Sequence, residues 1–369
     1  MPLILNLMCL GALASACTTV LVNTTSGVGV IGRTMELGSM DLPTDVTNTK
    51  MWRMMTIPRG GGIGQVRADG FHSSVYGFAG IGFWAPEPAE VEGVMGEGMN
   101  EKGLTVSALS FNSQGAYEAP GSGKPALACV DVVPYLLGSA KTAAEAVALL
   151  RGVAVVDDAH LTPLVGRFHW AVQDAAGAFV VLEYVGGTLH VHDAARVGVL
   201  TNDPEYEWHL KNLNQYALYS LDRVQEPDGP LRPFGHGLNT VGLPGSYSPP
   251  DRFAKMFLLR EAAARNAPPA STEEAVVLAA GLLNTVHIVM GTVANTEHED
   301  AGGLEWTEWS VVKVPAERKF YVRTYSAQGW REVDLAKMDH SAETAPVPLY
   351  RGLDVRPFEF GAAAATAEL

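Results

Sequence analysis

The sequence predicts an α+β fold built on antiparallel sheets. Segments with strand character and segments with helix character come in separate blocks along the chain and do not alternate as in a βαβ protein. Short turns that end in glycine join neighbouring strand segments, as in antiparallel hairpins. The chain contains no internal repeat, and the pairs Pro249-Pro250 and Pro268-Pro269 mark loops rather than a linker between domains. A single domain over residues 17–369 is therefore expected.

Two hairpins are predicted in the N-terminal part of the chain. Residues 17–23 and 28–33 are apolar runs on either side of a turn that ends at Gly27. Residues 91–99 and 103–109 flank a second turn of the same kind. Runs of this length around a short glycine-containing turn are typical of paired antiparallel strands.

Three helices follow from capping signals and from apolar periodicity. Thr142-Ala-Ala-Glu145 and Ser271-Thr-Glu-Glu274 are capping boxes, and the second opens a helix towards Val286. Residues 251–265 have the pattern of an amphipathic helix. The Ala-rich tail, residues 361–369, is predicted to be disordered. Further strands are predicted at residues 168–172, 178–184, 188–191, 306–314, 320–325 and 332–335.

Composition and charge exclude several classes of function. Of the 369 residues, 47% are hydrophobic and 18% are charged, as in an ordinary globular protein. The formal net charge is −14 and Lys and Arg form no cluster, so we expect neither nucleic acid nor an anionic membrane as a partner. After the N-terminal segment, no stretch approaches the ~18 uninterrupted apolar residues of a membrane span.

The N-terminal segment has the pattern of a cleaved signal peptide, residues 1–16. Residues 3–13 are mostly apolar, and Ala14-Ser15-Ala16 is a small-residue cleavage pattern, which predicts a periplasmic or secreted protein that begins at Cys17. Two alternatives stay open. The segment is a buried N-terminal strand or helix with an ordinary core cysteine, or it is a lipoprotein signal that ends in a lipidated Cys17.

Cys17 at a new N-terminus has the chemistry of a catalytic nucleophile. Its thiol is a strong nucleophile once ionised, and the α-amino group on the same residue titrates near ~7.7–8 and can act as a base at neutral pH. Cys9 leaves with the leader, and Cys129 lies in an apolar stretch typical of a protein core. We therefore expect no disulfide, and the sequence indicates no metal site and no cofactor. His190 and His192 lie on one face of a strand, but no matching Cys or His pair accompanies them, so we interpret them as a solvated strand end.

Two charged residues are predicted to lie near Cys17. A hairpin would bring Arg33 back beside the N-terminus, where its guanidinium favours the thiolate and can orient a neighbouring carboxylate. Glu36 can accept a hydrogen bond from the α-amino group and direct its lone pair towards the thiol. The alternative is a common Arg–Glu pair on the surface.

Five blocks of the sequence resemble the choloylglycine hydrolase family, which includes bile salt hydrolases and penicillin V acylases. They occur in the order and with nearly the spacing of that family, from Cys17 to about Leu335. The blocks are Cys17-Thr18, Gly32-Arg-Thr-Met-Glu36, Gly98-Met-Asn-Glu-Lys-Gly-Leu104, Val199-Leu-Thr-Asn-Asp-Pro204 continuing to Trp208 and Asn212-Leu-Asn-Gln-Tyr216, and Gly242-Leu-Pro-Gly-Ser-Tyr-Ser-Pro-Pro-Asp-Arg-Phe253.

The resemblance implies the four-layer αββα sandwich of N-terminal nucleophile hydrolases, with two stacked antiparallel sheets, assembled as a homotetramer. It also implies hydrolysis of a linear, non-peptide amide through a thioester on Cys17, with the α-amino group moving the protons. Arg33 matches the family arginine beside the nucleophile, and Arg252 matches a second arginine that supports the site. Asn202 matches the oxyanion-hole asparagine, and the backbone N–H of Ser110 completes that hole.

Two positions depart from the family, and both bear on activity and specificity. Glu36 stands where the family usually has Asp, and Ser110 stands where bile salt hydrolases tend to have Asn and penicillin V acylases Tyr. Phe83, Trp84 and Phe111 are the aromatic residues nearest the implied substrate cleft; core packing is the alternative for them.

The expected substrate is a small-molecule amide with a bulky apolar acyl group. Bile acids conjugated to glycine or taurine come first, and penicillin V and N-acyl homoserine lactones are the alternatives. A catalytically silent binding protein of the same fold is the alternative from a different class.

Overall fold

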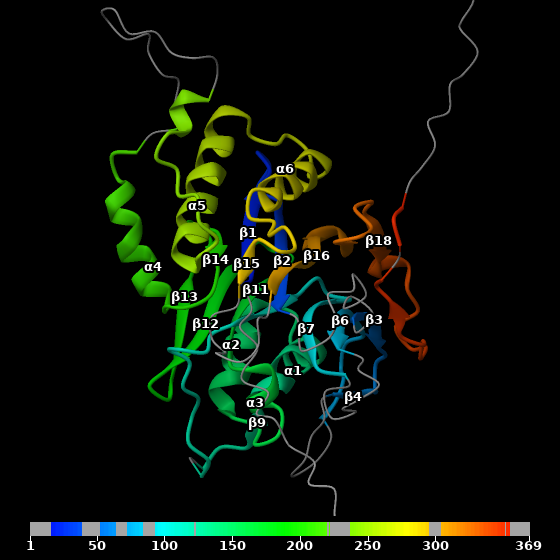
Figure 1. The fold of residues 1–369 in the computed structure, drawn as a ribbon. Coiled ribbons are helices and arrows are strands. Elements are labelled where there is room, and N and C mark those ends of the chain that lie inside the picture. The colour runs from blue at the N-terminus through cyan, green and yellow to red at the C-terminus, as the bar shows by residue number, and fades with distance from the viewer. Residues whose placement is uncertain are drawn as a thin grey trace, which may run out of the picture.

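Two antiparallel β-sheets lie face to face, and helices cover the outer side of each sheet (Figure 1). Every ladder of the two large sheets is antiparallel within the described residues. This four-layer arrangement confirms the predicted α+β fold class. The computed structural model describes residues 16–38, 52–63, 72–83, 93–121, 123–219, 221, 237–294, 304–350 and 352–354.

The first sheet carries the N-terminal hairpin. Its strand order is β14-β1-β2-β16-β17-β18, and β15 pairs with β16. Both strands of the hairpin lie inside the sheet, because β14 borders β1 and β16 borders β2. The strands are β1 (Thr18–Asn23), β2 (Gly29–Gly38), β14 (Val199–Leu200), β15 (Val293–Ala294), β16 (Leu304–Val314), β17 (Lys319–Thr324) and β18 (Arg331–Asp334).

The second sheet has the order β13-β12-β11-β8-β7-β6-β3-β19. Two small two-stranded sheets accompany it, one of β9 with β10 and one of β4 with β5. The strands of the second sheet are β3 (Trp52–Ile57), β6 (Phe78–Phe83), β7 (Met95–Asn100), β8 (Thr105–Ser110), β11 (Phe168–Gln173), β12 (Phe179–Val185), β13 (Thr188–Asp193) and β19 (Val347–Pro348). The small sheets contain β4 (Gly62–Ile63), β5 (His72–Ser73), β9 (Ala126–Ala128) and β10 (Ala154–Val156).

Helices pack on the outer face of each sheet. On the first sheet lie α5 and α6, with α4 beside α5, and on the second lie α1 and α2 (Figure 1). The helices are α1 (Val132–Ser139), α2 (Ala143–Gly152), α3 (Thr162–Val165), α4 (Tyr206–Asn212), α5 (Pro249–Asn266) and α6 (Thr272–Asn284). None of the helices among the described residues has the length and apolar character needed to cross a membrane.

The predicted capping residues begin their helices. Thr142 Oγ1 accepts a hydrogen bond from Glu145 N at 3.1 Å, and Ser271 Oγ accepts one from Glu274 N at 3.1 Å. Each hydroxyl thereby satisfies an N–H group that has no partner within its helix. The prediction of helices at α2 and α6 is confirmed, although α6 ends at Asn284, before Val286.

The predicted hairpins, the later strands and the amphipathic helix are also present. The second strand of the first hairpin is longer than predicted, and the first strand of the second hairpin starts later, at Met95. In α5 the helix starts at Pro249, two residues before the predicted start, because prolines fit the first helical turn. The predicted disordered tail, residues 361–369, lies outside the described residues, as does the leader up to residue 15.

Alternation along the hairpin sends neighbouring side chains to opposite faces of the first sheet. Arg33 points inward, because it contacts Glu97 on the second sheet. Gly32 faces outward, because a Cβ built there would lie 3.1 Å from Leu283 of α6. Odd-numbered residues of β2 therefore face the second sheet, and even-numbered residues face the helices. This division decides which residues can meet Cys17.

Candidate active site

Cys17 lies directly before β1, and its thiol faces the space between the two sheets. Thr19 pairs with Arg33 in the hairpin, so β2 carries Arg33 and Met35 alongside the N-terminal end of β1. Arg33 Nη2 lies 3.4 Å from Cys17 Sγ, and the Sγ lies 3.6 Å from Met35 Sδ. The hairpin thus places Arg33 beside Cys17, as the sequence predicted. A fixed cation at this distance stabilises a negative charge on the sulfur.

The guanidinium of Arg33 occupies the place where the ladder between β7 and β8 stops. The last pair of that ladder is Glu97 with Ser107, and the next pair would be Gly96 with Ala108. Instead, Arg33 Nη1 donates to Gly96 O at 2.8 Å and Nη2 donates to Ala108 O at 2.5 Å. Arg33 therefore satisfies two carbonyl groups of the second sheet while it contacts the thiol.

Burial and nearby charges act in opposite directions on Arg33. Its side chain is fully buried, and burial alone would lower the pKa of Arg33. The charges of Cys17 and Glu97, with their hydrogen bonds, outweigh burial and leave the pKa of Arg33 raised. Arg33 is therefore a permanent cation at the thiol.

Asn202 links the backbone of Cys17 to the second sheet. It follows β14, which pairs with β1, and this pairing brings it to the same end of the sheet as Cys17. Its Oδ1 accepts from Cys17 N at 2.8 Å, and its Nδ2 donates to Ser110 O at 2.9 Å. The amide NH₂ has two hydrogens, so one remains for a developing oxyanion beside the sulfur. The position suits the predicted oxyanion role, which stays a prediction.

The backbone N–H of Ser110 points towards the gap between β7 and β8 that the Arg33 guanidinium occupies. Phe111 N donates to Arg167 O, on the β11 side of the strand, at 2.8 Å. Because neighbouring N–H groups of a strand point to opposite sides, the Ser110 N–H points to the β7 side, beyond the last β7–β8 pair. The predicted second donor of the oxyanion hole therefore faces the same space as Arg33.

Arg252 holds the main chain of Cys17 from the outer side of the sheet. This α5 residue is fully buried, and its Nη1 donates to Cys17 O and to Thr18 Oγ1, each at 2.6 Å. Its Nη2 donates to Asn202 Oδ1 at 2.8 Å. Burial lowers the pKa of Arg252, and the charges of Glu36, Glu305 and Cys17 partly offset that effect. Arg252 holds Cys17 through its backbone, while Arg33 contacts the thiol itself.

Glu36 lies on the opposite face of the sheet from Arg33. Both residues are fully buried, so the alternative of a surface Arg–Glu pair is wrong. The carboxylate of Glu36 accepts from Thr307 Oγ1 at 2.7 Å and from Thr34 Oγ1 at 3.0 Å. Burial raises the pKa of Glu36 to about 8, although Arg252 and the two threonines act against it. The predicted bond to a free α-amino group concerns a chain cut after Ala16 and stays a prediction.

Two buried histidines hold the backbone around Asn202. His169 Nε2 donates to Thr201 O at 3.0 Å, and His209 Nε2 donates to Asn202 O at 2.9 Å. Burial lowers the pKa of His209 to about 4, so this imidazole is neutral at pH 7. Both rings are held in turn by stacking, His169 on Phe111 and His209 on Phe253.

Glu183 supports His169 from behind. Its carboxylate lies 3.5 Å from His169 Nδ1 and 3.0 Å from His192 Nε2, and it accepts from Tyr206 N at 3.1 Å. Burial acts to raise the pKa of Glu183, but the two histidines outweigh burial and lower it to about 2. His190 is exposed, as expected for a solvated strand end, but that interpretation is wrong for His192, which is partly buried and pairs with a buried carboxylate. Among the described residues, no group of three His, Cys, Asp or Glu side chains is arranged to hold a metal ion.

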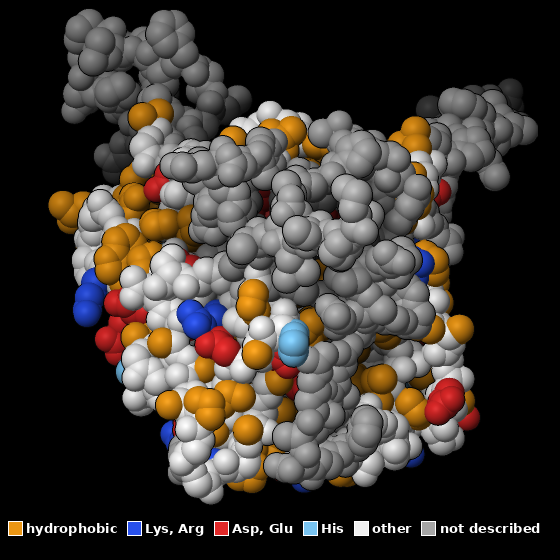
Figure 2. Space-filling view, turned by 60° about the horizontal axis from the view of Figure 1, so that its bottom comes forward, with side chains coloured by type: hydrophobic (Ala, Val, Ile, Leu, Met, Phe, Trp, Pro, Cys, Tyr) orange, Lys and Arg blue, Asp and Glu red, His pale blue; other side chains and the backbone are white. Residues whose placement is uncertain are grey.

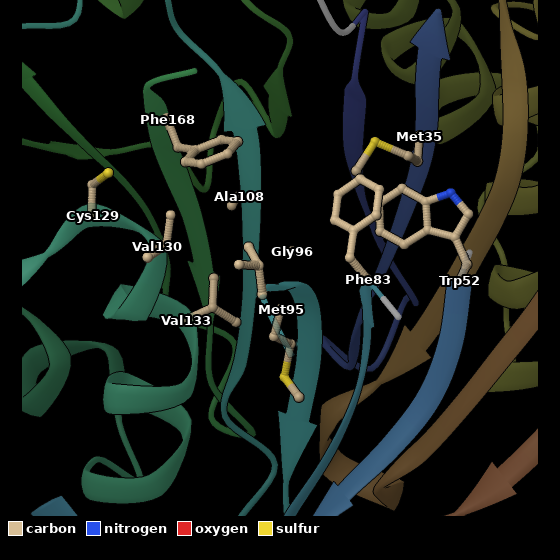
Figure 3. A pocket seen from close by; sticks show the side chains of 11 residues that line it. Met35, Trp52, Phe83, Met95, Gly96, Ala108, Cys129, Val130, Val133 and Phe168 are labelled. Carbon is tan, nitrogen blue, oxygen red and sulfur yellow. The ribbon is translucent and has the colours of Figure 1, made fainter. Parts of the chain in front are cut away.

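A small apolar pocket adjoins the thiol side of the site (Figure 3). Its volume is about 30 Å³, enough for roughly one water molecule. Met35 connects it to Cys17, and Trp52 and Phe83 stack against each other on one wall at a centroid distance of 4.0 Å. Opposite them lie Phe168 and Cys129 (Figure 3). Cys129 is buried as predicted, and burial raises the pKa of its thiol to about 11.

Of the three predicted substrate-binding aromatics, the two that the structure describes lie in different places. Phe83 lines the pocket. Phe111 directly follows β8, is fully buried and stacks on His169 at a centroid distance of 4.6 Å. Trp84 lies outside the described residues. Sequence reasoning missed Trp52 and Met35 as pocket residues, and it missed Glu97, His169, Glu183 and His209 around the site.

Glu308 anchors the pocket wall, and its ionisation is expected to make the stability of the protein depend on pH. It lies at a bulge between β16 and β2 and accepts a hydrogen bond from Trp52 Nε1. Burial raises the pKa of Glu308 to about 8, against an unfolded value of about 4.3. A raised carboxyl pKa gives stability that is complete below about pH 4.3 and is lost as the pH rises through 8. Glu308→Gln keeps an oxygen that accepts from Trp52 and has no proton to lose.

We expect the Tm of Glu308→Gln, relative to the unchanged protein, to rise between pH 5 and pH 8 and to level off above that. Thermal unfolding at several pH values from pH 5 to above pH 8 measures the difference. Titrating groups that do not interact with Glu308 cancel between the two proteins; Glu36 is the exception, because its charge helps to raise the pKa of Glu308. A difference that does not change with pH would show that Glu308 is ionised throughout.

Comparison with known proteins finds the same class of amide hydrolase in a family model and in individual relatives. The family model described as linear amide C–N hydrolases, choloylglycine hydrolase family, matches residues 17–344. A bile salt hydrolase/transferase from Clostridium perfringens is 28% identical over 248 residues, which are 65% of this chain and 72% of that protein. A penicillin V acylase from Pectobacterium atrosepticum is 28% identical over 227 residues, which are 59% of this chain and 53% of that protein.

A solved structure has the same fold. The crystal structure of a mutant conjugated bile acid hydrolase from Clostridium perfringens superposes with a TM-score of 0.78 at 23% identity, and the match covers 93% of this chain and 100% of that one. At this identity the likeness concerns the fold.

Proposed function

Since the chain belongs to the choloylglycine hydrolase family of linear amide C–N hydrolases, we propose that it hydrolyses amides through a thioester on Cys17, and that conjugated bile salts are its substrates. The observation that carries the proposal is the position of Cys17. Its thiol lies 3.4 Å from a buried arginine, and its backbone N and O are both held by side chains, those of Asn202 and Arg252.

The proposed reaction begins at the sulfur. The thiol of Cys17 gives its proton to the α-amino group of the same residue. Sγ then attacks the amide carbon, and the negative charge moves to the carbonyl oxygen. Asn202 Nδ2 and the Ser110 N–H are the donors that face this oxygen. The C–N bond then breaks, and the amine leaves with a proton from the α-amino group of Cys17. Water, deprotonated by the same group, attacks the thioester and releases the acid and the thiol.

This scheme requires removal of the leader. In the uncut chain Cys17 N is an amide that donates to Asn202 Oδ1, and Ala16 N donates to Glu305 Oε1 at 2.6 Å. We propose cleavage after Ala16, export to the periplasm or beyond, and a mature single domain over residues 17–369. Because an α-ammonium group carries more donors than an amide, it can keep the bond to Asn202 and still approach a carboxylate.

The pocket supports an apolar acyl group as the part of the substrate that is recognised. Its described lining is formed by apolar side chains and backbone, and it includes the flexible side chains Met35 and Met95. The cavity of about 30 Å³ is smaller than a ring system, and the flexible methionine side chains can adapt to a larger group. Deconjugation of glycine or taurine bile salts is the first proposal, on the strength of the relatives in that class. Hydrolysis of penicillin V or of an N-acyl homoserine lactone is the alternative, and a penicillin V acylase is among the relatives.

The charge of the surface does not favour a polyanionic partner. On the face in Figure 2, the Lys and Arg side chains of the described residues are scattered among acidic ones. With a net charge of −14, such a surface gives no electrostatic support for nucleic acid or an anionic membrane.

We propose a homotetramer, which light scattering on the purified protein tests directly.

The proposal is tested on the exported protein in two steps. Intact mass and N-terminal sequencing should find a chain that begins at Cys17 with a free amine. Incubation with glycocholate, taurocholate, penicillin V and an N-acyl homoserine lactone, with Cys17→Ala as the blank, should then release glycine and taurine fastest. Faster release from penicillin V would support the alternative. A protein that binds these amides without forming a thioester would be the silent binding protein, and an acylated N-terminus would indicate a lipid-anchored one.

A further inference from the structure

Cys17 and three further titratable side chains lie in a buried row between the two sheets. We name Cys17, Arg33, Glu97 and Lys313 the inter-sheet charge cluster. Arg33, Glu97 and Lys313 have fully buried side chains. Arg33 Nη1 lies 3.2 Å from Glu97 Oε2, and Lys313 Nζ pairs with Glu97 Oε1. Lys313 Nζ also donates to Ser107 Oγ at 3.1 Å.

The contacts of the cluster fix most of its charges. A guanidinium stays protonated in proteins, so Arg33 is a cation. Glu97 accepts from both Arg33 and Lys313, which makes it a carboxylate. With Lys313 as an ammonium, these three groups carry one excess positive charge in a space closed to water. The excess disappears in two ways: Cys17 becomes a thiolate, or Lys313 becomes an amine.

Among the described residues, the groups that contact the cluster from the inner side do not supply the missing negative charge. Gly96 O, Ala108 O and Ser107 Oγ are neutral acceptors, and the ring face of Trp309 lies 5.1 Å from the Arg33 guanidinium. Titratable groups also face Cys17 from the outer side of the sheet, where Arg252 contacts its carbonyl and Glu36 and Glu305 lie near Arg252. In the mature chain the α-amino group of Cys17 is a further base beside the thiol, and it is the same in every variant of the test.

We propose that Lys313 is a positioning residue for the nucleophile: through Glu97 and Arg33, its positive charge balances the thiolate of Cys17. This proposal rests on the proposed function only in taking Cys17 as the nucleophile. Burial lowers the pKa of Lys313, and the charge of Glu97 partly restores it. Loss of a proton from the thiol therefore favours the ammonium form of Lys313, and loss of a proton from Lys313 favours the thiol.

The test uses three variants of the mature chain and a readout that needs no substrate. The rate of alkylation of Cys17 by iodoacetamide is measured from pH 5 to pH 10, with the label located by peptide mass spectrometry. In Lys313→Met the excess charge is gone, so the pH of half-maximal alkylation should rise by about one unit, with about tenfold slower labelling on the acid side. Glu97→Gln leaves the two cations unpaired and should shift the same profile downward. The double variant, which loses one charge of each sign, should return it to within a few tenths of a unit of the unchanged protein.

Lys319→Met is the matched control, because Lys319 lies on the neighbouring strand β17 and pairs with Glu317 at the surface. The pH of half-maximal alkylation of Cys17 in Lys319→Met should equal that of the unchanged protein. If Lys313→Met lowers Tm and labelling equally at all pH values, Lys313 has only a structural role and the proposal is wrong. A shift of the same sign in Lys313→Met and Glu97→Gln would also overturn it. If the profiles shift as expected but no amide is hydrolysed, the proposed function fails and the charge coupling stands.

Discussion

Cys17→Ser is expected to lower kcat on every amide substrate by at least about 10⁴-fold, because a nucleophile of this kind acts with its base as one unit. The change replaces sulfur by oxygen in a side chain that is 1% exposed, so the fold should remain. A serine hydroxyl beside Arg33 stays protonated at neutral pH, since its ionisation lies far above that of a thiol. Turnover is measured with the best substrate of the panel, and thioester formation is measured by intact mass after rapid acid quenching.

The matched control is Cys129→Ala, at the second buried cysteine. This thiol lines the pocket and is 1% exposed, but its Sγ contacts Thr162 Oγ1 at 3.4 Å and has no place in the proposed reaction. We expect Cys129→Ala to form the thioester and to keep kcat within a few-fold. Full activity of Cys17→Ser with a thioester mass on Cys129 would show that Cys129, and not Cys17, is the nucleophile.

The position of Arg33 beside Cys17 could be predicted from the sequence, because it depends only on the geometry of one hairpin. Two short strands joined by a tight turn must lie side by side, and residue 33 then returns to residue 17. The same local logic predicted the capping residues Thr142 and Ser271. Such features need only the residues within one hairpin or one helical turn.

The inter-sheet contacts could not be predicted in this way. Lys313 and Glu97 are 216 positions apart, and a lysine inside a strand is as typical of a solvated face as of a buried ion pair. Arg33 and Glu36 are close in the sequence, but a spacing of three residues in a strand places their side chains on opposite faces. This alternation is a property of the sequence pattern alone, so the separation of the two residues was predictable.

Several elements were missed because their signals are weak. Strand β6, Phe-Ala-Gly-Ile-Gly-Phe, contains two glycines, which disfavour a strand interior, although close approach of Glu97 O leaves no room for a Cβ at Gly80. Helix α1 contains Pro134 and Gly138 within eight residues, so its helix propensity is low. Packing against β7 and β8 decides its structure instead.

Asn202→Ala is expected to lower kcat by roughly 10²–10³-fold, equal to about 2.7–4 kcal/mol of transition-state stabilisation, if its Nδ2 is a donor of the oxyanion hole. The effect should fall on kcat with little change in KM, because the charge on the oxygen develops only during the reaction. The change also removes the acceptor of Cys17 N and of Arg252 Nη2, so part of the loss reflects a less well-held nucleophile. Asn202→Asp keeps the acceptor and loses the donor, and because it also adds a negative charge beside the oxyanion, its loss of kcat is an upper limit for the contribution of the donor.

Thr201→Val is the control that isolates the side chain of Asn202 from the backbone around it. Thr201 is fully buried, and its Oγ1 donates to Pro249 O at 3.1 Å, away from the thiol. Val removes that bond but keeps the carbonyl that His169 holds, so Tm should fall while kcat stays within about threefold. If Asn202→Asp and Thr201→Val lowered kcat equally, this loop would act by its rigidity alone. A loss confined to the Asn202 variants instead means that a single N–H, positioned by two histidines and an arginine, stabilises the charge that the attack of the sulfur creates.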